Sequence, residues 1–149
     1  MTQSERDAAA LLPRVLIVDD ERRNRDLIEV MLSAEGYNLL TASSGEEAIV
    51  TVASERPDLV LLDVMMPGMD GYQVAMRLKG HAETAHIPII MLSALDDRNS
   101  RMHGLSAGAE DFLTKPVNRT ELCLRVRNLL RLIQPEEARS SDAVDRRQR

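Results

Sequence analysis

Five short apolar runs alternate with five amphipathic segments along this chain, and the alternation constrains its fold more than any other feature. The runs cover residues 15–18, 37–42, 59–62, 88–92 and 111–114. Most of them contain no polar residue, as expected for strands that are buried on both faces of a sheet. Each run is followed by a segment with helical spacing of its apolar residues, so the chain consists of repeated β–α units.

The helical segments differ in how strongly they are anchored. The first carries an i, i+3, i+4, i+7 pattern, and its expected buried stripe is Leu27, Val30, Met31 and Ala34. Ser44 and Glu47 form a capping-box pattern at the start of the second. The fourth, about 97–107, has only Met102 and Leu105 as large apolar anchors, so we expect a weakly held helix. The last begins at Asn118 and is anchored by Leu122, Val126, Leu129, Leu130 and Ile133.

Short connections between these units predict a doubly wound α/β fold. We expect a flavodoxin-like (βα)5 parallel sheet with strand order 2-1-3-4-5, in which the most polar run, 37–42, lies at an edge. Aromatic residues make up only 2% of the chain, so the core must be aliphatic. We expect one domain over residues 14–133, a flexible leader over 1–13, and a charged, disordered tail or linker over 134–149.

Composition excludes several classes of protein. The net charge of −5 argues against non-specific binding to nucleic acids or to anionic membranes. No apolar run approaches the roughly 18 residues that a membrane-spanning helix needs. The single cysteine, Cys123, excludes an intrachain disulfide and is typical of a reducing compartment, so we expect a cytoplasmic location.

Polar side chains stand where four of the predicted strands end. Asp19 and Asp20 follow the first strand, Asp63 the third, Ser93 the fourth and Lys115 the fifth. Because ligands bind beyond the carboxyl ends of such strands, these residues are expected to share one site. Three neighbouring carboxylates need a cation, and all-oxygen ligation favours Mg²⁺ or Mn²⁺. A carboxylate can also act as a nucleophile that forms an aspartyl phosphate, and the lysine and serine could hold phosphoryl oxygens.

Taken singly, these residues have structural explanations. Acidic pairs often cap helices, and a lone aspartate at a strand end often forms a turn. Their coincidence at the same end of four strands favours a functional site. The chain also fills 17 of its 19 basic positions with arginine, yet it has lysine at 115. A compact ammonium there has a role that a planar guanidinium would not fill.

These residues form an ordered set of motifs. The set comprises Asp19-Asp20, Asp63 with the following Met66-Pro-Gly-Met-Asp-Gly71, Ser93-Ala94 and Lys115-Pro116. It resembles the receiver domains of two-component response regulators, over about residues 14–133. Among receiver domains, the sequence is most similar to those attached to cyclic-di-GMP enzymes or to sensor-kinase hybrids. The glycines of the loop that follows Asp63 are expected to let the backbone approach the site closely.

The resemblance implies a role for each site residue. Asp63 would accept a phosphoryl group from a phosphohistidine of a sensor histidine kinase or phosphotransfer protein. Asp20 would bind Mg²⁺ (or Mn²⁺) directly, Asp19 largely through water, and Met65 through its backbone carbonyl, with Asp63 completing the protein ligands. Lys115 would pair with the phosphoryl oxygens.

The resemblance also implies a switch. Ser93 would move to the phosphoryl group, Phe112 would turn inward, and the peptide bond before Pro116 would be cis. The signal would reach the surface formed by the fourth helix, the fifth strand and the fifth helix. That surface would control a downstream protein or a fused output domain, or would form a homodimer. Direct nucleic-acid and membrane contacts are not expected.

Two other classes of protein remain to be compared with this signalling module, which would catalyse only its own phosphotransfer and dephosphorylation. A phosphatase of the haloacid-dehalogenase type expects a second aspartate two residues after the nucleophile, where this chain has Met65. A pseudo-receiver that serves purely as an interaction scaffold would not need the acidic pair, Asp63, Ser93 and Lys115.

Overall fold

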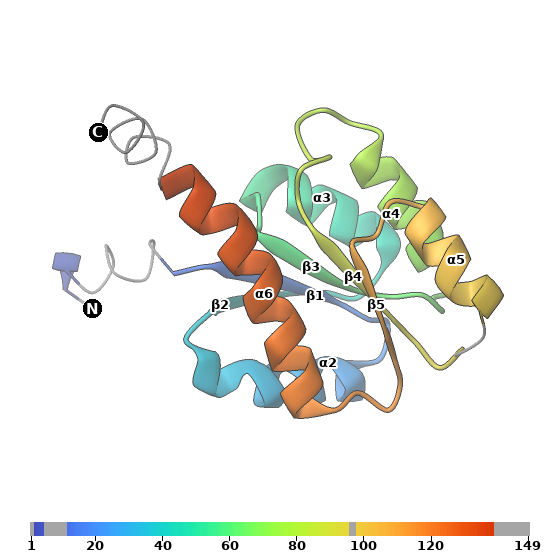
Figure 1. Ribbon diagram of the computed structural model, residues 1–149, viewed down its shortest axis with the longest axis horizontal. Helices are drawn as coiled ribbons and strands as arrows, with labels where there is room; N and C mark the ends of the chain where they lie inside the picture. The colour runs from blue at the N-terminus through green and yellow to red at the C-terminus, as the bar shows by residue number, and fades with distance from the viewer. Residues whose placement is uncertain (1, 5–11, 96–97, 139–149) are drawn as a thin grey trace, which may run out of the picture.

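A computed structural model describes residues 2–4, 12–95 and 98–138, which form a parallel sheet with helices on both faces (Figure 1). The strands are β1 (Arg14–Val18), β2 (Asn38–Ala42), β3 (Leu59–Asp63), β4 (Ile89–Ser93) and β5 (Asp111–Thr114). The helices are α2 (Arg22–Leu32), the 3-10 turn η1 (Ser33–Glu35), α3 (Gly45–Glu55), α4 (Gly71–Lys79), α5 (Arg98–Ser106) and α6 (Arg119–Ala138). The strand order β2-β1-β3-β4-β5 confirms the predicted flavodoxin-like fold.

The register of the sheet brings the carboxyl ends of its central strands together. Val18, at the end of β1, lies opposite Ala42 of β2 and Leu62 of β3. Asp63 lies opposite Leu92 of β4. All residues of β3 and β4 are buried, whereas β2 lies at an edge and is mostly half-buried, as its more polar sequence predicts.

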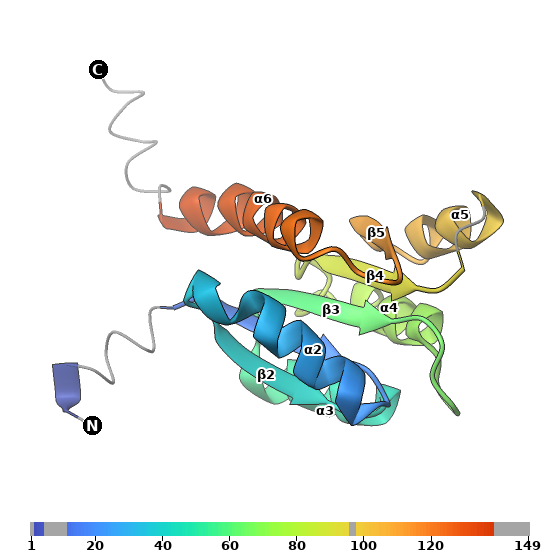
Figure 2. The ribbon, with the colours of Figure 1, turned by 90° about the horizontal axis from the view of Figure 1, so that it is seen from below.

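The sheet separates two apolar cores. Alternate residues of each strand point to opposite faces, so Leu16 packs with α3 and α4, while Ile17 packs with α2 and α6. Figure 2 shows α2 on the near side of the sheet and α3 and α4 behind it. Both cores are built almost wholly from aliphatic side chains, as the composition requires.

The buried face of α2 differs from the expected one. Leu27 and Val30 are 53% and 68% exposed, and Ala34 is exposed as well. Ile28 and Leu32 are buried instead, in the core that α2 shares with α6. The stripe is therefore displaced by one residue from the predicted stripe, which leaves two large apolar side chains of α2 on the surface.

Helix α5 is held by a glycine rather than by its large apolar residues. Met102 and Leu105, the expected anchors, are about half exposed. Gly104 is the buried residue of the helix, and a Cβ built there would lie 3.0 Å from Cδ2 of Phe112. The Phe112 ring is buried against this glycine, and the guanidinium of Arg101 lies 5.9 Å from the ring centroid. The close approach between α5 and β5 thus depends on the absence of a side chain at Gly104.

Helices α3 and α4 begin with side-chain caps. The Ser44 hydroxyl accepts from the Glu47 N–H at 3.1 Å, but the Glu47 carboxylate binds the N–H and hydroxyl of Ser43 instead of the backbone of Ser44. Helix α4 has the complete capping box, in which Asp70 and Gln73 accept from each other's N–H at 2.9 Å. Asp70 therefore fixes the start of the helix that follows the Asp63 loop.

At the end of the sheet away from Asp63, a lysine joins three segments. Nζ of Lys79 donates to the carbonyls of Ala85 and Ile87 at 3.0 and 2.8 Å and lies 2.5 Å from a Glu110 carboxylate oxygen. The other Glu110 oxygen accepts from the Ile89 N–H at 2.6 Å. The Lys79 side chain is only 16% exposed, so it stabilises this end of the sheet from inside.

The last helix continues past the predicted domain boundary. Asn118 caps α6 by accepting from the Glu121 N–H at 3.0 Å, and the helix extends to Ala138 rather than ending near 133. The remainder of the predicted tail, most of the predicted leader, and residues 96–97 lie outside the described residues. Among the described residues, no helix is long and apolar enough to cross a membrane.

Candidate functional site

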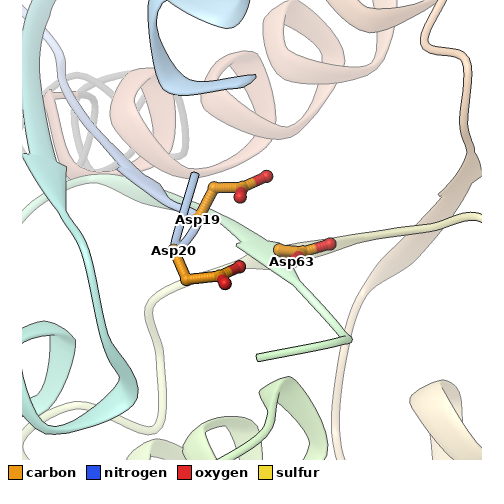
Figure 3. A group of neighbouring side chains, drawn as sticks. All are labelled: Asp19, Asp20 and Asp63. Atoms are coloured by element: carbon orange, nitrogen blue, oxygen red, sulfur yellow. The ribbon is translucent and has the colours of Figure 1, made fainter. Parts of the chain in front are cut away.

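Three carboxylates meet where β1 and β3 end (Figure 3). One carboxylate oxygen from each of Asp19, Asp20 and Asp63 lies within 4.8 Å of the other two. Asp63 is the last residue of β3, and the acidic pair follows β1 directly. Asp19 and Asp63 are buried, with 3% and 4% exposure, whereas Asp20 is exposed. The strand order thus forms an acidic pocket whose outer member faces solvent.

The lysine that directly follows β5 enters this pocket. Nζ of Lys115 donates to Oδ1 of Asp63 at 2.8 Å and to Oδ2 of Asp19 at 3.2 Å. Its backbone N–H donates to the Ser93 carbonyl at 2.7 Å and so extends the pairing of β4 with β5 by one residue. The following peptide bond, to Pro116, is cis. The single ammonium therefore bridges carboxylates from two different strands.

The charges of the pocket are strongly coupled. The pKa of Asp63 is raised from 3.8 to about 6: burial is the largest cause, the carboxylates of Asp19 and Asp20 add to the rise, and Lys115 opposes it. Burial disfavours the charged form of Lys115, but its hydrogen bonds and charge interactions with Asp63 and Asp19 raise the pKa of its ammonium. Asp63 therefore titrates near neutral pH beside a lysine that stays charged.

Asp19 is bonded at every polar group. Its Oδ1 accepts from the Glu21 N–H at 2.9 Å, and its Oδ2 accepts from Lys115. Its own N–H donates to the Ala42 carbonyl at 3.2 Å, and its carbonyl accepts from the Arg25 guanidinium at 2.8 Å. Both oxygens of this carboxylate are therefore already hydrogen-bonded within the protein.

The other two carboxylates keep oxygens available. Asp20 makes no side-chain hydrogen bond with any described residue, and Oδ2 of Asp63 makes none either. Since the described part of the chain contains no buried side-chain nitrogen or oxygen atom without a partner, Oδ2 of Asp63 must be reachable from solvent. Free carboxylate oxygens within 4.8 Å of one another suit a hard divalent cation, so the donor set fits Mg²⁺ or Mn²⁺.

The side chains of the remaining predicted residues do not join this cluster. The Ser93 side chain is fully buried, and its hydroxyl accepts from the Leu95 N–H at 3.0 Å. Phe112 lies in the core beside Gly104. The Met65 side chain is 62% exposed, two residues beyond Asp63.

One loop glycine touches the backbone of the acidic strand. The N–H of Gly71 donates to the Val64 carbonyl at 2.9 Å. A Cβ built at Gly71 would collide with the carbonyl oxygen of Asp63 and would lie 2.8 Å from Cα of Val64. The start of α4 is therefore pressed against the residue that carries the site, a contact that only glycine allows.

An apolar cavity of about 390 Å³ opens beside the pocket and was not predicted from the sequence. It lies between α2 and the segment after β5, next to Asp19 and Lys115. Its apolar lining is Leu27, Ile28, Leu92, Ala94, Pro116 and Val117. No sequence signal indicated the cavity, because the helical pattern places Leu27 inward, whereas the structure exposes it.

A flavodoxin-like sheet with an acidic pocket and a lysine at the ends of its strands defines a signalling receiver module rather than a conventional enzyme. The response regulator receiver domain family matches residues 15–127. The chain belongs to this family.

The chain is similar to known response regulators in sequence and to solved structures in fold. Response regulator PleD of Caulobacter vibrioides is 47% identical over 135 residues, which are 90% of this chain and 30% of PleD. Response regulator MprA of Mycobacterium tuberculosis is 44% identical over 131 residues, 88% of this chain and 56% of MprA. The structure of chemotaxis protein CheY4 of Vibrio cholerae has a TM-score of 0.75 and 29% identity, covering 79% of this chain and 98% of CheY4. The chain thus spans about a third of PleD and about half of MprA.

Proposed function

We propose that this chain is a phosphorylation-activated switch in which Asp63 accepts a phosphoryl group from a phosphohistidine of a sensor histidine kinase or phosphotransfer protein. The observation that carries the proposal is the asymmetry of the Asp63 carboxylate. Lys115 holds Oδ1 at 2.8 Å, while Oδ2 has no hydrogen bond and is reachable from solvent. One oxygen is thus oriented and the other is available for attack.

In the proposed transfer, Oδ2 of Asp63 attacks phosphorus, and the bond between phosphorus and the donor imidazole nitrogen breaks. The imidazole keeps the electron pair of that bond and is reprotonated from solvent. Lys115 stays charged and pairs with the phosphoryl oxygens. A bound Mg²⁺ or Mn²⁺ would neutralise carboxylate and phosphoryl charge. Asp20, Asp63 and the Met65 carbonyl would hold it, with Asp19 acting through water.

The donor is proposed to approach over the apolar cavity beside Asp19 and Lys115. This cavity adjoins the pocket, since Asp19 and Lys115 belong to its lining, and α2 contributes the exposed side chain of Leu27 to it. A phosphohistidine is carried by a protein, so its docking needs apolar contact area next to the reacting carboxylate.

The signal is proposed to leave the site through Ser93 and Phe112. The Ser93 hydroxyl would give up the hydrogen bond that it accepts from the Leu95 N–H and would donate to a phosphoryl oxygen instead. Phe112 would follow, and its contact with Gly104 would shift α5. The surface of α5, β5 and α6 would then control a downstream protein, a fused output domain or a second copy of the chain. Residues 14–133 are proposed as the receiver unit, in the cytoplasm.

Acid-labile labelling by phosphoramidate in the presence of Mg²⁺ tests the nucleophile. We expect the wild type to be labelled and Asp63→Asn to lose the label. Asp26→Asn, the same change at an exposed position of α2, should be labelled like the wild type. Undiminished labelling of Asp63→Asn would refute the assignment. No Mg²⁺-dependent labelling of the wild type would favour the scaffold alternative.

A further inference from the structure

In the turn between β1 and α2, a guanidinium holds the backbone of the acidic pair. NH1 of Arg25, on the first turn of α2, donates to the carbonyl oxygen of Asp19 at 2.8 Å. The strand pairing of β1 ends at Val18, so no neighbouring strand supplies a donor for this carbonyl. Asp19 is only 3% exposed, and its carbonyl needs a partner from the protein.

We propose that Arg25 is a positioning residue for the divalent cation site, acting through the peptide unit that joins Asp19 to Asp20. That unit is planar and includes the bonded carbonyl. Holding the oxygen therefore fixes the direction in which the chain enters Asp20. This inference rests on the metal site of the proposed function and adds a residue that does not touch the cation.

Asp20 depends on this anchor more than its neighbour does. The Asp19 carboxylate is held independently by the Glu21 N–H and by Lys115. The Asp20 side chain is exposed and makes no hydrogen bond with a described residue, so only its backbone can orient it. The neighbouring Asn24 contributes only a long contact, 3.5 Å, to Oδ1 of Asp19.

The direction in which loss of Arg25 changes the affinity for a divalent cation distinguishes a positioning role from an effect of charge alone. Arg25 is a cation near three carboxylates, so removing its charge alone would strengthen the binding of a divalent cation. Loss of positioning would weaken it. The guanidinium also interacts with Glu47: hydrogen bonds from Ser43 lower the pKa of that carboxyl most, and the charge of Arg25 adds to the effect.

The test is Mn²⁺ binding to the full chain, followed by electron paramagnetic resonance of the free ion. We expect Arg25→Gln to bind Mn²⁺ about tenfold more weakly than the wild type, as is usual for loss of a group that orients a ligand. Arg25→Lys keeps the charge and one donor, and we expect an intermediate affinity. Arg23→Gln removes an exposed charge from the same helical turn and should bind as tightly as the wild type or slightly more tightly.

An affinity of Arg25→Gln equal to or above that of the wild type would overturn the inference. So would equal weakening in Arg23→Gln, since bulk charge would then explain the result. Urea unfolding without metal checks that each variant folds. If Arg25→Gln does not fold, Arg25→Lys decides, and wild-type affinity in that variant counts against positioning. A wild type that fails to bind Mn²⁺ would instead refute the metal site of the proposed function, and this inference with it.

Discussion

Nζ of Lys115 lies 2.8 Å from Oδ1 of Asp63, although 52 positions separate the two residues in the sequence. The contact makes the two oxygens of one carboxylate unequal. It also lowers the pKa of Asp63 against the larger effect of burial, and the pKa is raised to about 6. Lys115 thus influences whether the Asp63 carboxyl is protonated near neutral pH. Through this protonation it affects both the stability of the fold and the reactivity of Asp63.

Asp63→Asn should stabilise the metal-free fold at pH 8. The folded-state pKa of Asp63 lies above its ordinary value of 3.8, so the folded state binds this proton more tightly than the unfolded state. Its contribution is fully present below about pH 4 and is lost as pH rises through about 6. Asparagine resembles the protonated form, and we expect a gain of about 1–3 kcal/mol at pH 8.

Urea unfolding of Asp63→Asn and wild type at pH 5 and pH 8 checks this result. The gain should be smaller at pH 5, where the wild-type carboxyl is largely protonated, and Mg²⁺ should reduce it at pH 8. A gain that does not change with pH would show that ionised Asp63 is not the destabilising group.

Lys115→Met should raise the pKa of Asp63 further. Lys115 lowers this pKa through its hydrogen bond and its charge, so its removal leaves burial and the carboxylates of Asp19 and Asp20 unopposed. Titration of the Asp63 carboxyl carbon by NMR measures the shift. Arg23→Gln, which loses an exposed charge, should leave the pKa near that of the wild type. A lower pKa in Lys115→Met would contradict the account.

Gly71→Ala should destabilise the fold by about 2–3 kcal/mol, since overpacking forces the backbone to shift. Its Cβ would collide with the carbonyl oxygen of Asp63 itself, so phosphoramidate labelling should fall as well. Gly36→Ala is the matched control: Gly36 has φ +81° and nothing within 4 Å of an added Cβ. It should lose about 1 kcal/mol through its left-handed backbone and keep normal labelling.

Gly104 and Phe112 should show energetic coupling in a double-mutant cycle. A Cβ built at Gly104 would lie 3.0 Å from Cδ2 of Phe112. When Phe112 is present, this contact offsets the gain in helix propensity that Gly104→Ala brings. In a Phe112→Leu background the ring is absent, and the same substitution should be more favourable by about 1 kcal/mol. Urea unfolding of the four proteins gives the coupling, and additive effects would show that the ring adjusts freely.

The strands were predictable because each is a nearly continuous apolar run, whereas the phase of a helix was not. Leu27-Ile28 and Met31-Leu32 are adjacent apolar pairs, so two stripes one residue apart fit the sequence of α2 about equally well. Packing against the sheet and α6 selects the stripe with Ile28 and Leu32. Sequence periodicity contains no information about that partner surface.

The acidic pocket followed from the rule that parallel strands end at one edge. Which of its oxygens are free did not follow, because this depends on backbone groups such as the Glu21 N–H and on a guanidinium from the next helix. The capping box of Asp70 and Gln73 was likewise hidden in a segment that reads as a turn.

The chain has two lysines, Lys79 and Lys115, and both ammonium groups lie inside ion pairs, at 16% and 25% side-chain exposure. An amine-acylating reagent therefore has two side-chain targets with different surroundings. Lys79 reports on the integrity of the far end of the sheet, and Lys115 reports on whether a ligand covers Asp63. Peptide mass spectrometry after brief acylation would thus measure two things on the same polypeptide. The modification of Lys115 would report whether the site is occupied, and the modification of Lys79 would report whether the fold is intact.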